Sequence, residues 1–157
     1  MKQLRGFTYD EISIGQTASY SKLIGEQDIQ MFSALSGDVN PVHLDETFAA
    51  TSMFGERIAH GMLTGAVVSA ALAMELPGPG CLYLGQTLRF SCPVKIGDRI
   101  TVQLEVIKKR DDKQFITMNC EVFNQDNELV ASGESMVMAS PEKLQIDRPP
   151  SPQFKLI

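Results

Sequence analysis

Apolar and polar residues follow two different periods along the first part of the chain. Residues 17–24 mix β-branched and polar side chains, a composition that suits a first strand. Ile29, Phe32 and Leu35 then recur at the spacing of one helix face, so the sequence predicts an amphipathic helix after Gly25. The chain is therefore expected to open with a strand and a helix that has one apolar side.

The segment after this helix carries residues that interrupt regular structure. Gly37 is a natural residue just past a helix end, and Pro41 lacks the N–H that a continuing helix needs. Residues 37–44 are therefore expected to form a loop. Asp45 can then cap a second, short helix that runs to Met53.

Residues 58–76 show a different pattern, because they are apolar on nearly every side and rich in alanine and glycine. A helix without a polar face is buried in a protein or in a membrane. A few polar residues interrupt this run, and its apolar part is shorter than the roughly 20 residues of a membrane span. The sequence therefore predicts a central helix covered by other elements, which ends at the "PGPG" of residues 77–80.

Four strand-like stretches follow, separated by short polar turns, at residues 82–93, 99–108, 115–123 and 129–139. Consecutive strands joined by such turns pair antiparallel. One long helix laid on an antiparallel sheet is an α+β fold, which is the class that we predict. Because a single sheet leaves an edge unpaired, we also expect a homodimer or a higher homo-oligomer.

The chain has 157 residues, which is enough for one compact domain. We place this domain at residues 1–140. Residues 141–157 contain several prolines, and we interpret them as an extended arm or a linker.

Composition and charge argue against several classes of function. The net charge of −5 argues against a nucleic-acid partner, because phosphate binding needs concentrated lysine and arginine. The first 15 residues hold no apolar run, so we expect no signal peptide, no membrane association and a cytoplasmic location. The three cysteines are far apart and the two histidines are too few for a metal cluster. No glycine-rich phosphate loop is present, and we expect no cofactor.

The loop "SGDVNPVH" is the most informative stretch for chemistry, because it holds Asp38 and His43 in one short turn. A carboxylate and an imidazole together can take a proton from water and deliver one to carbon. Asn40 can orient either group or a water molecule between them. The alternative is structural, since aspartate after a helix-ending glycine and asparagine before proline are common turn residues.

A second candidate is "AHGM", residues 59–62, at the start of the predicted central helix. The first N–H groups of a helix have no partner inside it, and a glycine lets a ligand oxygen approach the backbone closely. The N–H of Gly61 is therefore a candidate oxyanion hole for a substrate carbonyl. The alternative is that Gly61 only permits tight packing. His60 is interpreted as structural.

These segments resemble a known family. Residues 32–50, "FSALSGDVNPVHLDETFAA", are similar to the hydratase-2 motif of MaoC-like, (R)-specific enoyl-CoA hydratases, which has Gly-Asp-x-Asn-Pro-x-His at its centre. "AHGM" resembles the entry to the central helix of that family, and residues 82–98 resemble its second-strand region. The resemblance covers roughly residues 8–140. Similar domains also occur fused ahead of phosphate acetyl- or butyryltransferase domains, with a proline-rich junction like this arm.

The resemblance implies a hot-dog fold, in which an antiparallel sheet wraps a long central helix and a short helical overhang carries the catalytic loop. It implies a dimer and the reversible syn hydration of a trans-2-enoyl thioester to the (R)-3-hydroxyacyl product. The catalytic pair then falls on Asp38 and His43, the oxyanion donor on the Gly61 N–H, and a supporting serine on Ser69. The implied substrate is an acyl-CoA thioester, or an acyl group on acyl carrier protein.

Two other functions compete with this one. A hot-dog thioesterase often uses a carboxylate on or beside the central helix, whereas the predicted helix carries only Glu75, at its far end. A non-catalytic subunit that binds acyl thioesters needs neither Asp38 nor His43. Both observations favour a hydratase.

Overall fold

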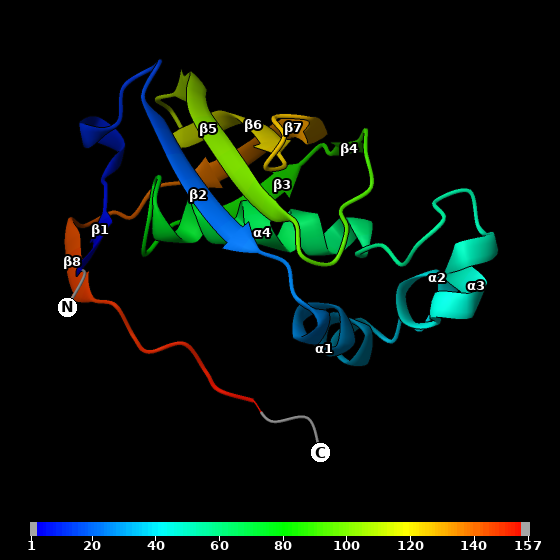
Figure 1. Ribbon diagram of the computed structural model, residues 1–157. Helices are drawn as coiled ribbons and strands as arrows, with labels where there is room; N and C mark the ends of the chain where they lie inside the picture. Colours follow the sequence, from blue (N-terminus) through cyan, green and yellow to red (C-terminus); the bar gives the residue numbers. More distant parts are fainter. Residues whose placement is uncertain (1–2, 155–157) are drawn as a thin grey trace.

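The computed structural model describes residues 3–154 of the chain. An antiparallel sheet packs on one long helix, α4, and a group of shorter helices extends beyond the start of that helix (Figure 1). The strands are β1 (Gln3–Gly6), β2 (Thr17–Leu23), β3 (Leu82–Gln86), β4 (Arg89–Phe90), β5 (Arg99–Arg110), β6 (Phe115–Phe123), β7 (Leu129–Met138) and β8 (Leu144–Asp147). The helices are the 3-10 turn η1 (Tyr9–Glu11), α1 (Glu26–Ser36), α2 (Pro41–Leu44), α3 (Glu46–Thr51) and α4 (Gly61–Met74).

The main sheet has the strand order β2-β5-β6-β7-β3, with β4 also paired to β7, and its strand pairs are antiparallel. Along β6, Ile116, Met118, Cys120 and Val122 are buried and alternate with more exposed residues. This alternation is typical of a sheet that turns one face to the core. The core side of the sheet packs on α4, so the predicted α+β arrangement is confirmed.

Helix α4 has the small and apolar residues that a central helix requires. Val68 and Leu72 are almost fully buried, whereas Ser69 lies on the exposed side. The helix begins at Gly61 and not at residue 58, because the backbone of His60 is not helical, with φ −59° and ψ 136°, and forms the N-cap. Within residues 3–154, we find no helix that combines the length and the apolar character needed to cross a bilayer.

The predicted loop over residues 37–44 is correct only in its first half. Gly37 ends α1 with a φ of 77°, in the left-handed region that favours glycine. Pro41, however, starts the short helix α2, because a proline at the first helical position gives up no hydrogen bond inside the helix. The next helix, α3, follows Asp45 as predicted, and the side chain of Asp45 caps it through the Phe48 N–H.

The strand predicted over residues 82–93 is instead divided into β3 and β4. The strand is interrupted at residues 87 and 88, where the backbone of Thr87 passes close to Gly133 of β7. A Cβ atom at residue 133 would lie 2.0 Å from the Thr87 carbonyl oxygen, so only glycine permits this close passage. Further along, Phe90 of β4 lies against Gly61 at the start of α4.

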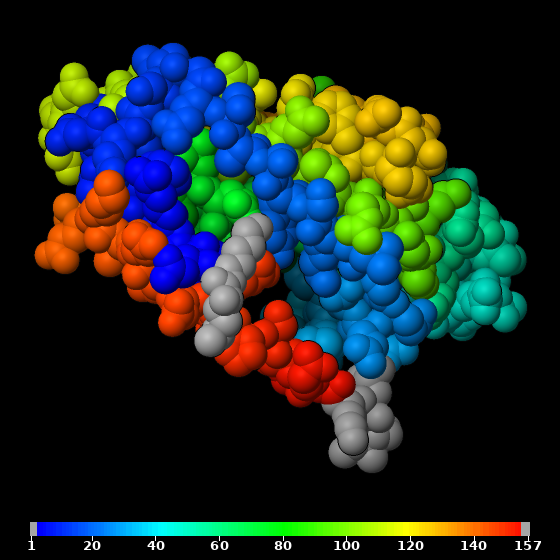
Figure 2. All heavy atoms as spheres, turned by 60° about the vertical axis from the view of Figure 1, so that its left-hand side comes forward, coloured from blue at the N-terminus to red at the C-terminus, as the bar shows by residue number. Residues whose placement is uncertain are grey.

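The first and last strands pair with each other, a feature that the sequence does not indicate. Strands β1 and β8 pair antiparallel as a separate two-stranded sheet, with Gln3 opposite Asp147. Figure 2 shows the N-terminal segment, in blue, beside the C-terminal segment, in orange. The arm expected at residues 141–157 therefore contains a paired strand. Residues 155–157 of this arm, like residues 1–2, lie outside the described residues.

Candidate active site

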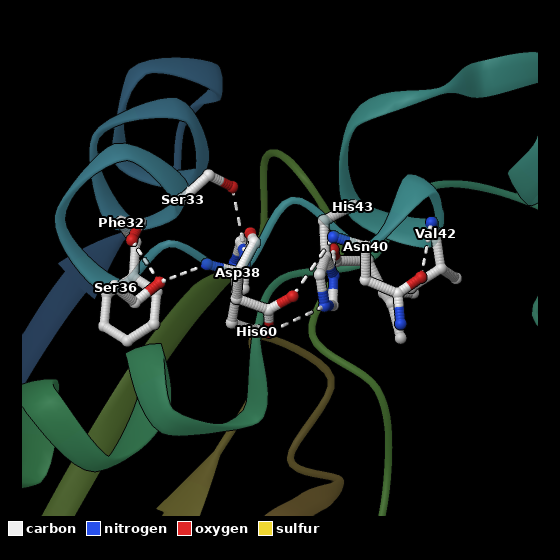
Figure 3. Close-up of polar contacts among 9 residues, drawn as sticks. Phe32, Ser33, Ser36, Asp38, Asn40, Val42, His43 and His60 are labelled. Carbon is white, nitrogen blue, oxygen red and sulfur yellow. Dashed lines mark hydrogen bonds and ion pairs between the residues drawn. The ribbon is translucent and has the colours of Figure 1, made fainter.

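In the loop between α1 and α2, the side chains of Asp38 and Asn40 each accept a hydrogen bond from a backbone N–H two residues further along the chain. Oδ1 of Asp38 accepts a hydrogen bond from the Asn40 N–H at 3.1 Å. The side-chain oxygen of Asn40 accepts one in turn from the Val42 N–H at 3.2 Å, which caps α2. These turns fix the backbone from which Asp38 and His43 project (Figure 3).

The side chain of His43 is buried, and a backbone carbonyl orients it. Its Nδ1 lies 2.8 Å from the Ile58 carbonyl oxygen, which can only accept a hydrogen bond. Nδ1 therefore carries a proton, and the lone pair of the neutral ring lies on Nε2. Nε2 is 3.9 Å from Oδ2 of Asp38, whose side chain is 50% exposed. The predicted pair thus comes together with one buried and one solvated partner.

His60, for which the sequence predicts a structural role, lies in the same cluster. Its ring stacks on that of His43, with centroids 3.8 Å apart and planes at 29°. Its Nε2 lies 3.0 Å from the Asp38 carbonyl oxygen and 3.1 Å from Oγ of Ser33 (Figure 3). No local pattern indicates these contacts, because the two partners lie 22 and 27 residues earlier in the chain.

Gly61 stands at the open end of α4, beside a cavity of about 300 Å³. As the first residue of the helix, it has an N–H group without a partner inside the helix. The lining of the cavity includes His60, Gly61, Thr64, Phe90, Cys92 and Val94. A ligand carbonyl in this cavity would meet the positive end of the helix dipole.

The two supporting residues lie in different places. Asn40 is in the loop beside the pair, but its side-chain oxygen is used to cap α2. Ser69 follows Gly61 by eight positions on α4, about 12 Å away at 1.5 Å per residue, and is exposed. The single chain therefore brings Asp38 and His43 to the start of α4 but leaves Ser69 apart.

An ion pair holds the helices around the site together. The Arg57 guanidinium donates to both carboxylate oxygens of Glu26 and lies 3.4 Å from the Leu44 carbonyl oxygen. The hydrogen bond from Arg57 lowers the pKa of Glu26, and the same bond raises the pKa of Arg57. Because Glu26 opens α1 and Leu44 ends α2, the pair links two helices of the overhang.

Asp38, His43 and His60 each offer a ligand atom, and these atoms lie within 4.8 Å of one another, a grouping that metal sites share. One nitrogen of each ring, however, is already bonded to a carbonyl oxygen. Because the rings are stacked, an ion in the plane of one ring lies outside the plane of the other, which is poor geometry for two histidine ligands. The cluster therefore suits proton transfer better than metal binding.

The chain matches known proteins over most of its length. The family model described as MaoC like domain matches residues 10–127. The chain is 44% identical over 126 residues to the (R)-specific enoyl-CoA hydratase of Aeromonas caviae, across 80% of this chain and 94% of that protein. It is 39% identical over 147 residues to the 3-hydroxybutyryl-CoA dehydratase of Methylorubrum extorquens, across 94% of this chain and 92% of that protein.

Solved structures give the same result for the fold. The unliganded R-hydratase PhaJ1 from Pseudomonas aeruginosa is 50% identical and superposes with a TM-score of 0.93, covering 99% of each chain. The (R)-hydratase from A. caviae is 43% identical and superposes with a TM-score of 0.78, over 81% of this chain and 96% of that one. The expected hot-dog fold is thereby confirmed. The chain belongs to the MaoC-like family.

Proposed function

We propose that this chain is an (R)-specific enoyl-CoA hydratase, which adds water reversibly to a trans-2-enoyl-CoA thioester. The observation that carries the proposal is the approach of His43 Nε2 to Asp38 Oδ2, at 3.9 Å, beside the open start of α4. Acid–base chemistry needs such a pair, and a thioester that accumulates negative charge needs such a helix end. The relatives named (R)-specific enoyl-CoA hydratase support the choice of reaction and of product configuration.

The proposed reaction forms a C–O bond at C3 of the substrate and a C–H bond at C2. The water oxygen attacks C3 while one member of the pair takes a proton from it, and the π electrons of the double bond move toward the thioester carbonyl. The pair then delivers one proton to C2, which restores the thioester and returns the pair to its starting protonation state. Both Nε2 of His43 and Oδ2 of Asp38 can take the first proton. In the proposed reaction both groups face the same side of the double bond, so water and proton add to one face and the addition is syn.

The N–H of Gly61 is the proposed donor to the thioester oxygen as negative charge develops there. The cavity beside it has mostly apolar walls, to which Phe90 and Val94 contribute. Such walls exclude water and strengthen the interaction of a fixed donor with a developing charge. In this proposal Asn40 contributes by holding the loop on which the acid–base pair stands.

The proposed assembly is a homodimer that joins through strand β3. This strand forms an edge of the main sheet, and its residues Leu82 and Leu84 are 54% and 41% exposed. An edge strand with apolar side chains is suited to pairing with a second copy. We propose that Ser69 takes its supporting role in the dimer, because in the single chain this residue is exposed and lies apart from Asp38 and His43.

The stereochemistry of turnover tests the proposal. The purified protein is mixed with crotonyl-CoA, with (R)-3-hydroxybutyryl-CoA or with (S)-3-hydroxybutyryl-CoA, and the absorbance of the enoyl thioester is followed. We expect this absorbance to fall with crotonyl-CoA and to rise with the (R) isomer only, without release of free thiol. Release of coenzyme A would indicate a thioesterase, and binding without turnover would indicate a non-catalytic subunit.

A further inference from the structure

His60 contacts each of the three parts of the proposed active site. Its backbone is the N-cap of α4, directly before the Gly61 N–H. Its Nε2 lies 3.0 Å from the backbone carbonyl of Asp38, and its ring stacks on that of His43. The residue is only 2% exposed, so these contacts are shielded from solvent. One side chain therefore connects the acid–base loop with the helix that carries the oxyanion donor.

The contacts of Nε2 decide which ring nitrogen carries the proton. The Asp38 carbonyl oxygen can only accept, so Nε2 of His60 must donate. The Ser33 hydroxyl oxygen, 3.1 Å away, shares this N–H. Nδ1 is buried and has no hydrogen-bond partner among the residues that the structure describes. His60 is therefore an Nε2–H donor, whereas His43 is an Nδ1–H donor toward Ile58.

Packing alone does not explain a histidine at this position. A buried polar atom without a partner, such as Nδ1, destabilises a fold, and an aromatic hydrocarbon ring would fill the same space without that cost. The ring of Phe32, 5.0 Å away, already supplies an apolar neighbour from α1. What histidine adds is a donor at the tip of a rigid ring whose face supports the ring of His43.

We propose that His60 is a positioning residue for hydration, an inference that rests on the proposed hydratase function. Its Nε2–H holds the backbone of Asp38, and its ring sets the plane of His43, both relative to Gly61 on the same helix start. A displacement of about 1 Å between reacting groups can lower a rate about 100-fold. Loss of the donor is therefore expected to lower kcat about 10- to 100-fold, with a smaller change in KM.

Two amide variants separate a positioning role from a packing role. His60→Gln places an amide N–H near the position of Nε2, whereas His60→Asn places it near Nδ1, where the described residues offer no acceptor. We expect His60→Gln, which keeps the donor but loses the stacked ring, to retain a clearly higher kcat than His60→Asn, which should lose about 10- to 100-fold. Ser33→Ala is the matched control, because it removes the second partner of Nε2 and leaves the Asp38 contact. It should stay near the wild-type kcat.

The wild-type protein itself provides an independent readout. The chain has two histidines, so 15N-labelled histidine gives only two ring systems in an NMR spectrum, and His60→Gln assigns them. We expect the Nε2–H tautomer at His60 and the Nδ1–H tautomer at His43. An Nδ1–H tautomer at His60, or equal kcat values for folded His60→Gln and His60→Asn, would overturn the proposal. A wild-type protein that hydrates no enoyl-CoA would contradict the hydratase function itself, before any variant is compared.

Discussion

Nε2 of His43 lies 3.9 Å from Oδ2 of Asp38, so the two side chains face each other without a direct hydrogen bond. Both atoms can accept a proton, and one water molecule can hydrogen-bond to both across such a separation. Under the proposed function this water is the nucleophile. The two residues should then behave as one unit and not as independent contributors.

The first prediction concerns this unit. His43→Gln removes the Nε2 lone pair and should lower kcat about 10²- to 10⁴-fold, the usual range for general acid–base catalysis. The double variant with Asp38→Asn should lose little more than either single variant, because both groups serve one step. The kcat for steady-state hydration of crotonyl-CoA is measured for the two single variants and the double variant. Losses that multiply in the double variant would contradict a shared step.

Gly61→Ala tests the oxyanion hole. The added methyl group narrows the approach to the N–H, and we expect kcat to fall about 100-fold, as for the loss of one oxyanion donor. The methyl group would also lie 3.2 Å from the ring of Phe90, so this ring must shift to make room for it. Combining it with Phe90→Leu relieves that contact and keeps this wall of the cavity apolar, so the double variant should regain thermal stability but not kcat. Full recovery of kcat would show that Gly61 only permits packing.

The ion pair of Glu26 and Arg57 predicts a pH dependence of stability. The pKa of Glu26 is lowered from its ordinary value of 4.5 in the folded protein, so the pair stabilises the fold above this pH and is lost as the pH falls below it. Glu26→Gln should destabilise the protein at neutral pH by no more than about 1 kcal/mol, because the carboxylate is 42% exposed. Denaturant unfolding should show this difference shrinking as the pH is lowered below 4.5.

Glu105→Gln is the control for that measurement, because it removes an exposed carboxylate on β5. It should leave stability unchanged at each pH. A difference between Glu26→Gln and wild type that persists undiminished in acid would contradict the assignment to the ion pair.

The proposed dimer depends on the edge of the sheet. Placing charges on β3 with Leu82→Glu and Leu84→Glu should prevent strand pairing and give a monomer in sedimentation velocity. Ile14→Glu replaces another exposed apolar residue, outside the main sheet, and should leave the dimer intact. A wild-type protein that sediments as a monomer at micromolar concentration would exclude the assembly, and a dimer that survives both charges would exclude this interface.

Local patterns predicted most of the fold correctly. The period of two along β5 and β6 follows directly from a sheet with one buried face, and the cap at Asp45 is satisfied within three residues. The central helix is recognisable because a covered helix has no polar side. The loop predicted at Pro41 was wrong. A proline in the interior of a helix breaks it because the N–H is missing, but at the first helical position that N–H has no partner to lose.

Contacts between distant segments could not be predicted in this way. Strands β1 and β8 have four residues each and lie at opposite ends of the chain, so neither shows a period or a nearby partner. The same applies to His60, whose role depends on a carbonyl 22 residues earlier and on a ring that α2 carries. The proximity of Asp38 and His43 could be predicted from the sequence, because both residues lie in one short loop.

The kcat of Asp38→Asn for crotonyl-CoA hydration tests the central claim most directly. Asparagine keeps the size of the side chain and an oxygen for the Asn40 N–H, but it cannot take up a proton as a carboxylate does. The control is Asp10→Asn, a change at an exposed carboxylate in η1. We predict a loss of at least about 100-fold in kcat for folded Asp38→Asn and none for Asp10→Asn. A folded Asp38→Asn protein that hydrates crotonyl-CoA at the wild-type rate would contradict the account and leave the loop as a structural turn.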